Sequence, residues 1–456
     1  MFLHTEKTPG LAHLSYVVGD SGHACVIDPQ LDCQRYIEIA NEHQCKIVHI
    51  LETHRNEDFI SGAHALAQLT GATVWHGPHS DAHISYAKTV YEDDCFNIGK
   101  LRLCVLETPG HTFDSVCYSL FDTNFSEDTP VGVFTGDTLF IGDVGRTDFY
   151  PGRDEHMAGL LYRSLQKLVQ LGDQVQVFPA HGAGSVCGSG MADREFSTIG
   201  YERRFNPPIS AGDEQAFIAR KAAETHYQAP YFQMMENANV EGVALNLSRL
   251  QCQPLSNGNL SRWLDRTKAT GVILDVRDLN TVKARYIQKS LCLHGPLISA
   301  YAGWFLAHKP SIMLVAADYQ QALDAHRQLM RMGIDTVQGY TTDVPMQVTS
   351  DDRTIEQIDT VAADSVRQRL AQWDHWTLLD VRKAEEVEAM PMPGSTHIYL
   401  GHLAERYPEL PPDRHYTVMC GSGKRATAGA SFLKAKGYKN VDVFTGSMMA
   451  WQALNQ

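Results

Sequence analysis

Short apolar runs bounded by turn residues dominate the first part of the chain. Several of them alternate apolar and polar positions, which predicts β-strands over residues 14–18, 24–27, 46–51 and 101–106. Between them, residues 35–42 and 62–69 carry apolar side chains at helical spacing. This pattern predicts an α/β domain of two sheets covered by helices.

The second half of the chain repeats itself. The motif Ile-Leu-Asp-Val-Arg at 273–277 returns as Leu-Leu-Asp-Val-Arg at 378–382, and Met-Gly-Ile at 332–334 returns as Lys-Gly-Tyr at 436–438. A fixed spacing of about a hundred residues indicates duplicated domains. Each copy alternates strands and helices, which favours a parallel sheet with helices on both faces.

Two polar or proline-containing stretches separate these parts. Residues 197–239 hold an Asn-Pro-Pro sequence and then a helical pattern, typical of a domain tail and linker, and a polar stretch covers 341–358. The predicted architecture is therefore α/β throughout, with three domains over residues 1–245, 250–345 and 355–456.

Composition agrees with a folded, multidomain protein. A chain of 456 residues is too long to form a single hydrophobic core. Its content of 43% hydrophobic and 20% charged residues is ordinary for a globular protein. A formal charge of -14 disfavours binding to nucleic acids or anionic membranes. No apolar run approaches the roughly 20 residues of a membrane span, and residues 1–10 do not resemble a secretion signal.

The ten cysteines form no Cys-x-x-Cys pairs, which favours a reducing, cytoplasmic location. Most lie in apolar stretches, where we expect buried small hydrophobes, for example Cys25, Cys45, Cys104 and Cys117. Cys187, in Ser-Val-Cys-Gly, is interpreted either as a sulfur relay or as an inert structural thiol.

Four sets of polar residues follow apolar strands, where α/β folds commonly place their chemistry. They are Glu-Thr-His-Arg-Asn-Glu-Asp-Phe at 52–59, Thr-Pro-Gly-His-Thr at 108–112, Thr-Gly-Asp-Thr-Leu at 135–139 and Pro-Ala-His-Gly at 179–182. A single histidine among 21 is more often a core residue. Four such sites in this order are hard to explain by packing alone.

The order of these motifs resembles the metallo-β-lactamase superfamily over residues 1–240, whose signature is His-x-His-x-Asp-His, Gly-His, Gly-Asp and a late His. The resemblance implies an αββα sandwich. Two positions depart from it, because Asn56 and Phe59 stand where zinc hydrolases of the superfamily have histidines. An amide is a poor ligand and a phenyl ring is none, so we expect a two-metal site that has lost part of one half.

The donors that match the signature are His54, His111 and Asp137. Two imidazoles and one carboxylate form the facial triad that holds non-haem Fe(II) with open positions. The persulfide dioxygenase branch resembles the chain in these motifs, and there the matching residues bind the iron. The resemblance implies that Asp58 and His181 orient ligands or a bound water. A turn carboxylate at Asp58 and a metal-binding His181, which would favour zinc, stay open.

The sequence Gly-Arg-Thr-Asp follows the Asp137 strand, and the resemblance implies that Arg146 pairs with a carboxylate of the substrate. The alternative is an ordinary ion pair with Asp143 or Asp148. Glutathione-using relatives tend to read Pro-Ala-His-Asp-Tyr and Asn-Pro-Arg, whereas this chain has Gly-Ala at 182–183 and Asn-Pro-Pro at 206–208. We therefore expect another low-molecular-weight persulfide or a protein-bound one.

In the last domain, a predicted strand and a predicted helix flank Cys-Gly-Ser-Gly-Lys-Arg at 420–425. Backbone N–H groups, the helix N-terminus and nearby cations stabilise a thiolate in such a loop. The loop resembles a rhodanese active loop. This implies a sulfane-sulfur carrier, Cys420, a cradle formed by Gly421, Ser422 and Gly423, and two cations for thiosulfate or sulfite, Lys424 and Arg425.

Cysteine-based phosphatases share this design but place five residues between Cys and Arg, whereas four stand here. The shorter loop favours sulfur transfer. The middle copy has Ala316 and Gln321 at the positions of Cys420 and Arg425, so we expect an inactive rhodanese-like domain. Spacing, docking or a dimer surface are open roles for it.

Together these motifs suggest a persulfide dioxygenase that uses O2 and one Fe(II) to make sulfite, with Cys420 forming or consuming thiosulfate. Small-molecule persulfide, O2, sulfite and thiosulfate are the expected partners, and a homo-oligomer stays open. A zinc thioesterase resembling glyoxalase II, with accessory rhodanese modules, is the main alternative. A non-enzymatic sulfur carrier or sensor is a third.

Overall fold

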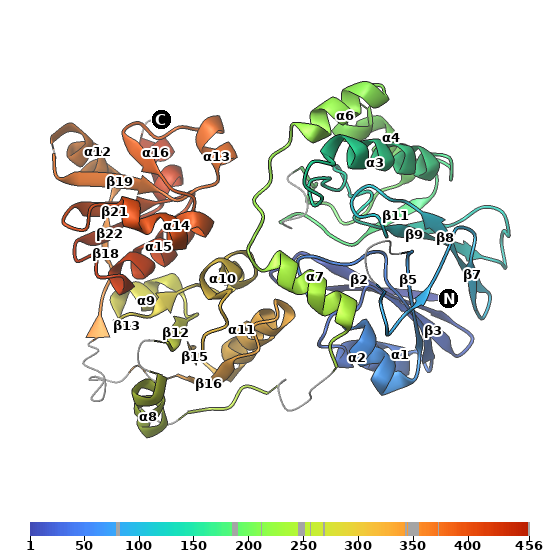
Figure 1. Cartoon of the computed structure of the whole chain (residues 1–456), viewed down its shortest axis with the longest axis horizontal. Coiled ribbons are helices and arrows are strands. Elements are labelled where there is room, and N and C mark those ends of the chain that lie inside the picture. Colours follow the sequence, from blue (N-terminus) through green and yellow to red (C-terminus); the bar gives the residue numbers. More distant parts are fainter. Residues whose placement is uncertain are drawn as a thin grey trace. The chain divides into compact units, whose positions relative to one another are not determined.

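The computed structural model describes the chain except residues 79–82, 185–189, 211, 245–250, 256, 268–269, 343, 345–354, 373 and 455–456 (Figure 1). Contacts divide it into two compact units. Residues 1–246 with 331–333 form the first, and residues 247–330 with 334–456 form the second. The second unit contains both predicted rhodanese-like copies, so the separate boundary between these copies stays a prediction.

The first sheet of unit 1 has six strands in chain order. The first three pair antiparallel and the others parallel. These strands are β1 (Phe2–Lys7), β2 (Leu14–Asp20), β3 (His23–Ile27), β4 (Lys46–Leu51), β5 (Thr73–His76) and β6 (Lys88–Thr89). Helices α1 (Gln34–Glu42) and α2 (Ala63–Thr70) contact this sheet through β2, β4 and β5.

The second sheet has the order β11-β10-β9-β8-β7. Its strands are β7 (Cys95–Ile98), β8 (Leu101–Glu107), β9 (Val116–Asp122), β10 (Gly132–Gly136) and β11 (Gln176–Pro179). Of these strands, β10 and β11 pair parallel and the other neighbours pair antiparallel. Its helices are α3 (Asp154–Val169), α4 (Ile199–Phe205), α5 (Pro207–Ser210) and α6 (Glu214–Ala222).

Alternation along the strands divides apolar side chains between two cores. Tyr16, Leu103 and Tyr118 lie in the core between the two sheets, whereas Cys117 and Val133 face the core that contains Leu161 and Leu165 of α3. Each fully buried aliphatic or aromatic side chain contributes roughly 1.5–3 kcal/mol relative to exposure. The sandwich is therefore helix, sheet, sheet, helix, and the predicted αββα fold is confirmed.

The middle module of unit 2 has a four-stranded parallel sheet of order β14-β12-β15-β16. Its strands are β12 (Val272–Asp275), β14 (Leu291–Cys292), β15 (Ile312–Val315) and β16 (Val337–Thr341), and a small separate sheet pairs β13 (Tyr286–Ile287) with β17 (Ile355–Glu356). Its helices are α8 (Asn257–Thr267), α9 (Leu279–Ala284), η2 (Gly295–Leu297), α10 (Ile298–Leu306) and α11 (Tyr319–Arg331).

The last module has a five-stranded parallel sheet of order β18-β22-β21-β19-β20. Its strands are β18 (Asp359–Val361), β19 (Trp376–Asp380), β20 (Ser395–His397), β21 (His415–Met419) and β22 (Val441–Phe444). Its helices are α12 (Ala363–Gln372), α13 (Ala384–Ala389), η3 (Leu400–His402), α14 (Leu403–Arg406), η4 (Tyr407–Glu409), α15 (Lys424–Ala435) and α16 (Ser447–Leu454).

The two modules share one strand order over four strands, since β14-β12-β15-β16 corresponds to β20-β19-β21-β22. The repeated Asp-Val-Arg motif also makes the same contact twice. Arg277 binds Asp275 through two N–H groups, and Arg382 binds Asp380 in the same way, with all four side chains buried. The sequence repeat therefore reflects a repeated architecture.

The cysteines depart from the prediction at one place. Cys104 is not a buried free thiol but is half-buried and joined to Cys95 by a disulfide. The two residues face each other across the antiparallel β7–β8 pair, with Cα atoms 4.2 Å apart. Cys25, Cys45 and Cys117 are buried and free, as predicted.

Within the residues that are described, the chain has no helix that is both long and apolar enough to cross a membrane.

Candidate metal centre and sulfur-transfer loop

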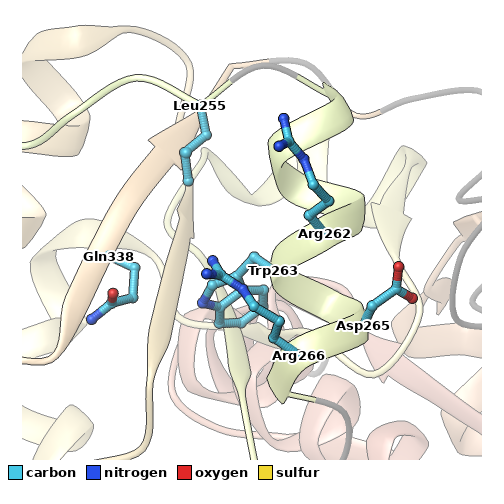
Figure 2. A pocket seen from close by; sticks show the side chains of 6 residues that line it. All are labelled: Leu255, Arg262, Trp263, Asp265, Arg266 and Gln338. Atoms are coloured by element: carbon cyan, nitrogen blue, oxygen red, sulfur yellow. The ribbon is translucent and has the colours of Figure 1, made fainter.

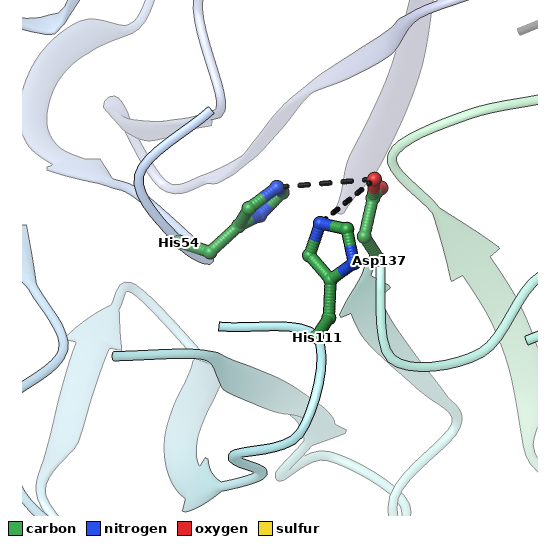
Figure 3. A group of neighbouring side chains, drawn as sticks. All are labelled: His54, His111 and Asp137. Atoms are coloured by element: carbon green, nitrogen blue, oxygen red, sulfur yellow. Dashed lines mark ion pairs between the residues drawn. The ribbon is translucent and has the colours of Figure 1, made fainter. Parts of the chain in front are cut away.

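Three loops at the ends of strands bring His54, His111 and Asp137 together. One donor atom from each lies within 4.8 Å of the other two, and all three side chains are buried. Asp137 Oδ2 is 3.9 Å from His54 Nε2 and 3.5 Å from His111 Nε2 (Figure 3). The two imidazole rings are 5.0 Å apart and nearly perpendicular. The three predicted ligands thus converge on one point.

The donor atoms that face this point have no hydrogen-bond partner in the described part of the chain. These atoms are Nε2 of His54, Nε2 of His111 and Oδ2 of Asp137. The other ring nitrogens are held from behind, because His54 Nδ1 is 2.9 Å from Thr53 Oγ1 and His111 Nδ1 is 3.0 Å from the carbonyl of Arg146. Such contacts fix the tautomer that turns the Nε2 lone pair inward.

Burial without partners is costly for polar atoms, and a bound cation removes that cost. Burial lowers the pKa of His54, which favours the neutral imidazole that a metal requires. Burial opposes ionisation of Asp137, but His181, His54 and His111 hold its pKa below the usual range. The donor set therefore fits one divalent cation, and its composition suits Fe(II).

A chain of buried charges extends behind Asp137. Its Oδ1 is 2.7 Å from His181 Nδ1, and His181 Nε2 is 3.2 Å from Asp58 Oδ2. Burial disfavours the imidazolium, yet the two carboxylates raise the pKa of His181 well above its usual value. Both nitrogens of His181 are thus engaged by carboxylates. The orienting role of His181 and Asp58 stays a prediction, and both side chains are buried.

Sequence reasoning missed Glu57. Its carboxylate is buried, with Oε1 3.5 Å from His111 Nε2 and Oε2 4.0 Å from His54 Nε2. The sequence did offer one signal for Glu57, since it is a carboxylate at an unspecified (x) position of the His-x-His-x-Asp-His motif. Phe59 is fully buried against the ring of His13, with ring centroids 4.2 Å apart. An apolar contact thus lies at the position where the resemblance places a metal-binding histidine.

Helix α7 (Phe232–Glu241) holds the loop that carries His54. Asn239 donates to the carbonyls of Asn56 and Phe59, at 2.7 and 2.9 Å, and accepts from the N–H of Ser61 at 2.8 Å. Arg55 forms an ion pair of 2.9 Å with Glu236 of the same helix. The predicted tail segment is therefore part of the metal centre's support.

Arg146 is paired inside the protein. Its guanidinium binds both carboxylate oxygens of Asp148 at 2.6 and 2.7 Å and lies over the rings of Phe149 and Phe232. Burial raises the pKa of Asp148, but Arg146 outweighs this and lowers it. The structure shows the ion pair that the sequence offered as an alternative, so substrate binding by Arg146 stays a prediction. Cys187 lies outside the described residues.

The predicted cysteine loop joins β21 to α15. Cys420 is buried, and its Sγ accepts the backbone N–H of Gly423 at 3.1 Å. Gly423 has a φ of +97°, a conformation that glycine adopts without strain. Ser447 accepts the N–H of Cys420 at 3.1 Å, which fixes the loop from the other side. The sulfur therefore lies at a helix N-terminus within a backbone cradle, the setting that stabilises a thiolate.

The two predicted cations differ in their surroundings. Lys424 is exposed, as is Ser422, whereas Arg425 is half-buried. Both terminal nitrogens of Arg425 bind the carboxylate of Glu386, at 2.5 and 2.7 Å. Burial opposes ionisation of Glu386, but Arg425 keeps its pKa below the usual range. Glu386 was not predicted, because it lies 39 residues before Arg425.

The middle module has a hollow of its own, about 560 Å³ in volume (Figure 2). Arg266 and Trp263 of α8 lie on the side of the helix toward Gln338, while Asp265 points away. The lining residues include two guanidinium groups and no thiol; they are Leu255, Arg262, Trp263, Asp265, Arg266 and Gln338. This hollow therefore does not reproduce the chemistry of the Cys420 loop.

Comparison with known families assigns the two sites to different domains. Residues 8–181 match the Metallo-beta-lactamase superfamily, and residues 362–454 match the Rhodanese-like domain. The first range contains His54, His111 and Asp137, and the second contains Cys420 and Arg425.

Among individual relatives, the Beta-lactamase hydrolase-like protein of Xylella fastidiosa (strain 9a5c) is 29% identical over 248 residues, which cover 47% of this chain and 54% of that protein. The chain thus spans about half the length of that relative. Persulfide dioxygenase ETHE1, mitochondrial, from Mus musculus is 30% identical over 210 residues, 44% of this chain and 73% of that protein.

The crystal structure of a metallo-beta-lactamase from Staphylococcus aureus subsp. aureus COL superposes with a TM-score of 0.67 and 29% identity. It covers 75% of this chain and 98% of its own. Because that share exceeds what the first unit holds, the likeness extends into the second unit.

Proposed function

The chain belongs to the metallo-beta-lactamase superfamily, within the persulfide dioxygenase family, and carries a rhodanese-like domain. From this premise we propose that it oxidises the outer sulfur of a persulfide to sulfite and transfers sulfane sulfur through Cys420. The observation that carries the proposal is the convergence of three buried donors, His54, His111 and Asp137, on one point.

Ferrous iron held by these three residues would supply open positions for O2 and for a persulfide anion. The overall reaction balances as persulfide anion, O2 and water giving thiol, sulfite and one proton. The outer sulfur loses four electrons, and O2 accepts all four. The protein must hold the anion, exclude competing solvent and accept protons.

Two buried groups fit these tasks. Glu57 lies beside the imidazoles of His54 and His111, where its carboxylate can accept a proton released during the reaction. The Asp137–His181–Asp58 chain keeps Asp137 ionised and fixes its orientation. Oδ2 of Asp137 thus faces the point where the three donor atoms converge, while Oδ1 contacts His181.

Sulfur transfer uses the second site. The Cys420 thiolate attacks the sulfane sulfur of thiosulfate, the S–S bond of thiosulfate breaks, and sulfite leaves with the electron pair. The Cys420 persulfide then gives its outer sulfur to an acceptor and regains the thiolate. In the opposite direction, sulfite accepts the sulfur and thiosulfate forms. The sulfite made at the metal centre is thus an acceptor for Cys420.

The competing proposal is a zinc thioesterase with accessory rhodanese modules. The name of the Xylella fastidiosa relative and the shared fold favour it. Two observations weigh against it, since Asn56 and Phe59 stand at histidine positions of the two-metal signature, and His181 is engaged by Asp137 and Asp58.

Metal analysis together with an oxygen electrode separates the two. We expect one iron per chain and one O2 consumed per sulfite formed when a low-molecular-weight persulfide is added. Two zinc ions per chain and thioester cleavage without O2 uptake would overturn the proposal. Glutathione persulfide, coenzyme A persulfide and cysteine persulfide, compared under equal conditions, test the expected departure from glutathione.

A further inference from the structure

The guanidinium groups beside the Cys420 loop are each joined to a carboxylate. Arg425, the last residue of the loop, gives both terminal nitrogens to Glu386, at 2.5 and 2.7 Å. Arg382 binds Asp380 in a similar bidentate way, with contacts of 3.0 and 2.6 Å. The positive charge that an incoming anion meets is therefore smaller than the number of basic side chains suggests.

The carboxylate of Glu386 is fixed from its own helix as well. Glu386 lies in the first turn of α13, where its Oε2 accepts the backbone N–H of Lys383 at 3.0 Å. Burial raises the pKa of Glu386, but Arg425 outweighs burial and lowers it. The carboxylate is thus ionised, and three N–H groups hold it in one orientation.

This ion pair borders the backbone that carries the sulfur. A Cβ atom on Gly421, the residue after Cys420, would lie 3.3 Å from Nη2 of Arg425 and 3.9 Å from Oε1 of Glu386. The two side chains are only partly exposed, at 17% for Arg425 and 38% for Glu386. Because solvent screens such a pair incompletely, an anion that reaches Cys420 interacts with both charges.

We propose that Glu386 is a positioning residue that sets the charge preference of the sulfur-transfer site. By holding and neutralising Arg425, it favours donors with one negative charge at the reacting end, such as a persulfide anion, over doubly charged thiosulfate. The other cation of the loop, Lys424, is exposed and stays available to a single charge. This inference rests on the proposed sulfur transfer at Cys420.

The charge preference bears on the direction of sulfur flow. A persulfide would load Cys420 readily, whereas thiosulfate would bind weakly both as a donor and as a product. Thiosulfate that forms when sulfite accepts the sulfur from Cys420 is then released easily. Glu386 thus favours the use of the site to make thiosulfate over its use to consume it.

Two sulfane-sulfur donors that differ by one charge isolate this effect. Thiosulfate is a dianion, and methanethiosulfonate, with a methyl group in place of one oxygen, is a monoanion. With either donor, the Cys420 thiolate attacks the sulfane sulfur, the S–S bond breaks, and sulfite or methanesulfinate leaves with the electron pair. Cyanide then takes the outer sulfur as thiocyanate and returns the thiolate. A dianion gains about twice the electrostatic attraction of a monoanion at the same place.

The test uses the full-length protein and two variants that each lose one carboxylate. Glu386→Gln keeps the size of the side chain and one acceptor oxygen for Arg425. Glu388→Gln removes the same charge from an exposed position on the same helix and is the matched control. Thermal unfolding shows that each variant is folded, and Glu386→Met, another good helix former, replaces the glutamine variant if that one does not fold.

Initial rates of thiocyanate formation give KM and kcat for each donor. We expect Glu386→Gln to lower the KM for thiosulfate about 3- to 10-fold and that for methanethiosulfonate about 2- to 3-fold, with kcat within about twofold. The control should keep every constant within about twofold. An unchanged or raised KM for thiosulfate in the folded variant would overturn the inference. If wild-type transfer persists in Cys420→Ser, the proposed function fails and not this inference alone.

A second readout reports the local charge without a sulfur donor. Alkylation of Cys420 by anionic iodoacetate and by neutral iodoacetamide, followed by mass spectrometry of the Cys420 peptide, gives a ratio of rates. Glu386→Gln should raise this ratio severalfold, and Arg425→Gln, which leaves the carboxylate without its guanidinium, should lower it. An equal change with both reagents in Glu386→Gln would show a merely structural role.

Discussion

At the scale of single residues, Asn239 supports the candidate metal centre without supplying a ligand to it. Its amide satisfies two carbonyls and one N–H of the loop over residues 56–61. Asn239→Ala leaves these buried groups without that partner, at about 1–3 kcal/mol for each unsatisfied group. Because three groups are affected, we expect unit 1 to lose at least about 3 kcal/mol of unfolding free energy and to bind iron more weakly.

Urea unfolding and iron titration measure both effects. Asn237→Ala is the control, because Asn237 lies on the same helix but is exposed. Equal stability and iron affinity in the two variants would contradict this assignment.

Glu57 gives a second prediction at this scale. Glu57→Gln keeps the size of the side chain but removes the carboxylate that lies 3.5 Å from His111 Nε2. If Glu57 accepts a proton, oxygen uptake falls at least about 100-fold while iron content stays at one per chain. Metal analysis and the oxygen electrode on the same sample decide. Loss of iron would instead identify Glu57 as a ligand.

The site residues that could be predicted lie within short sequence motifs. The residues that could not be predicted act through partners that are distant in the sequence. His54, His111 and Asp137 each belong to a short motif after a strand. Asn239 contacts a loop more than 170 residues earlier, and no local pattern distinguishes it from a surface amide.

At the scale of elements, the turn between β8 and β9 depends on one glycine. Gly110, directly before His111, has a φ of +147°, and a Cβ there would be 2.4 Å from the backbone of Leu161 in α3. Gly110→Ala must therefore push the turn away from α3. We expect a large fall in Tm of unit 1 together with loss of iron.

The control is Gly152→Ala. Gly152 also has a positive φ, of +73°, but a Cβ there meets nothing within 4 Å. Backbone strain alone should cost about 1–2 kcal/mol and leave iron binding intact. Calorimetry and metal analysis compare the two, and similar behaviour would rule out the steric explanation.

Asp442 on β22 predicts a pH effect in the last module. It accepts hydrogen bonds from Thr417 on β21 at 2.6 Å and from Arg369 on α12 at 2.7 Å, and it contacts His415 at 2.8 Å. Burial raises its pKa, but these partners outweigh burial and lower it. Stabilisation from a lowered carboxyl pKa is complete above the unfolded value of about 3.9 and is lost as the pH falls through the folded value.

Asp442→Asn should therefore be less stable than wild type by a constant amount between about pH 5 and pH 7. The difference should shrink below about pH 4. Urea unfolding of unit 2 at several pH values measures it, and a difference that grows on acidification would contradict the assignment.

Elements were predictable where periodicity is strong. The strands over residues 46–51 and 101–106 agree with β4 and β8 within one residue. The disulfide between Cys95 and Cys104 could not be foreseen, because the pairing depends on the register of β7 with β8. Register comes from the turn and from packing, which a cysteine count does not contain.

At the scale of the whole molecule, the chain carries the two proposed centres in different units. If the two centres work independently, a substitution in one centre should abolish only the activity of that centre. Cys420→Ser should keep oxygen uptake within about twofold and lose the formation of thiosulfate from persulfide and sulfite. His111→Ala should lose iron and oxygen uptake, while Cys420-dependent transfer from thiosulfate to cyanide continues. Loss of both activities in either variant would argue against separate centres.

Mixing these two variants tests how sulfite passes between the centres. Cys420→Ser still makes sulfite, and His111→Ala still carries sulfane sulfur on Cys420. If sulfite is released to solution, the mixture forms thiosulfate from persulfide and O2 at a rate that rises with the concentration of His111→Ala. We expect this behaviour, because sulfite is a small, well-hydrated dianion and a diffusible acceptor. Wild type that outpaces a concentrated mixture more than about tenfold would instead show that sulfite is kept within one molecule.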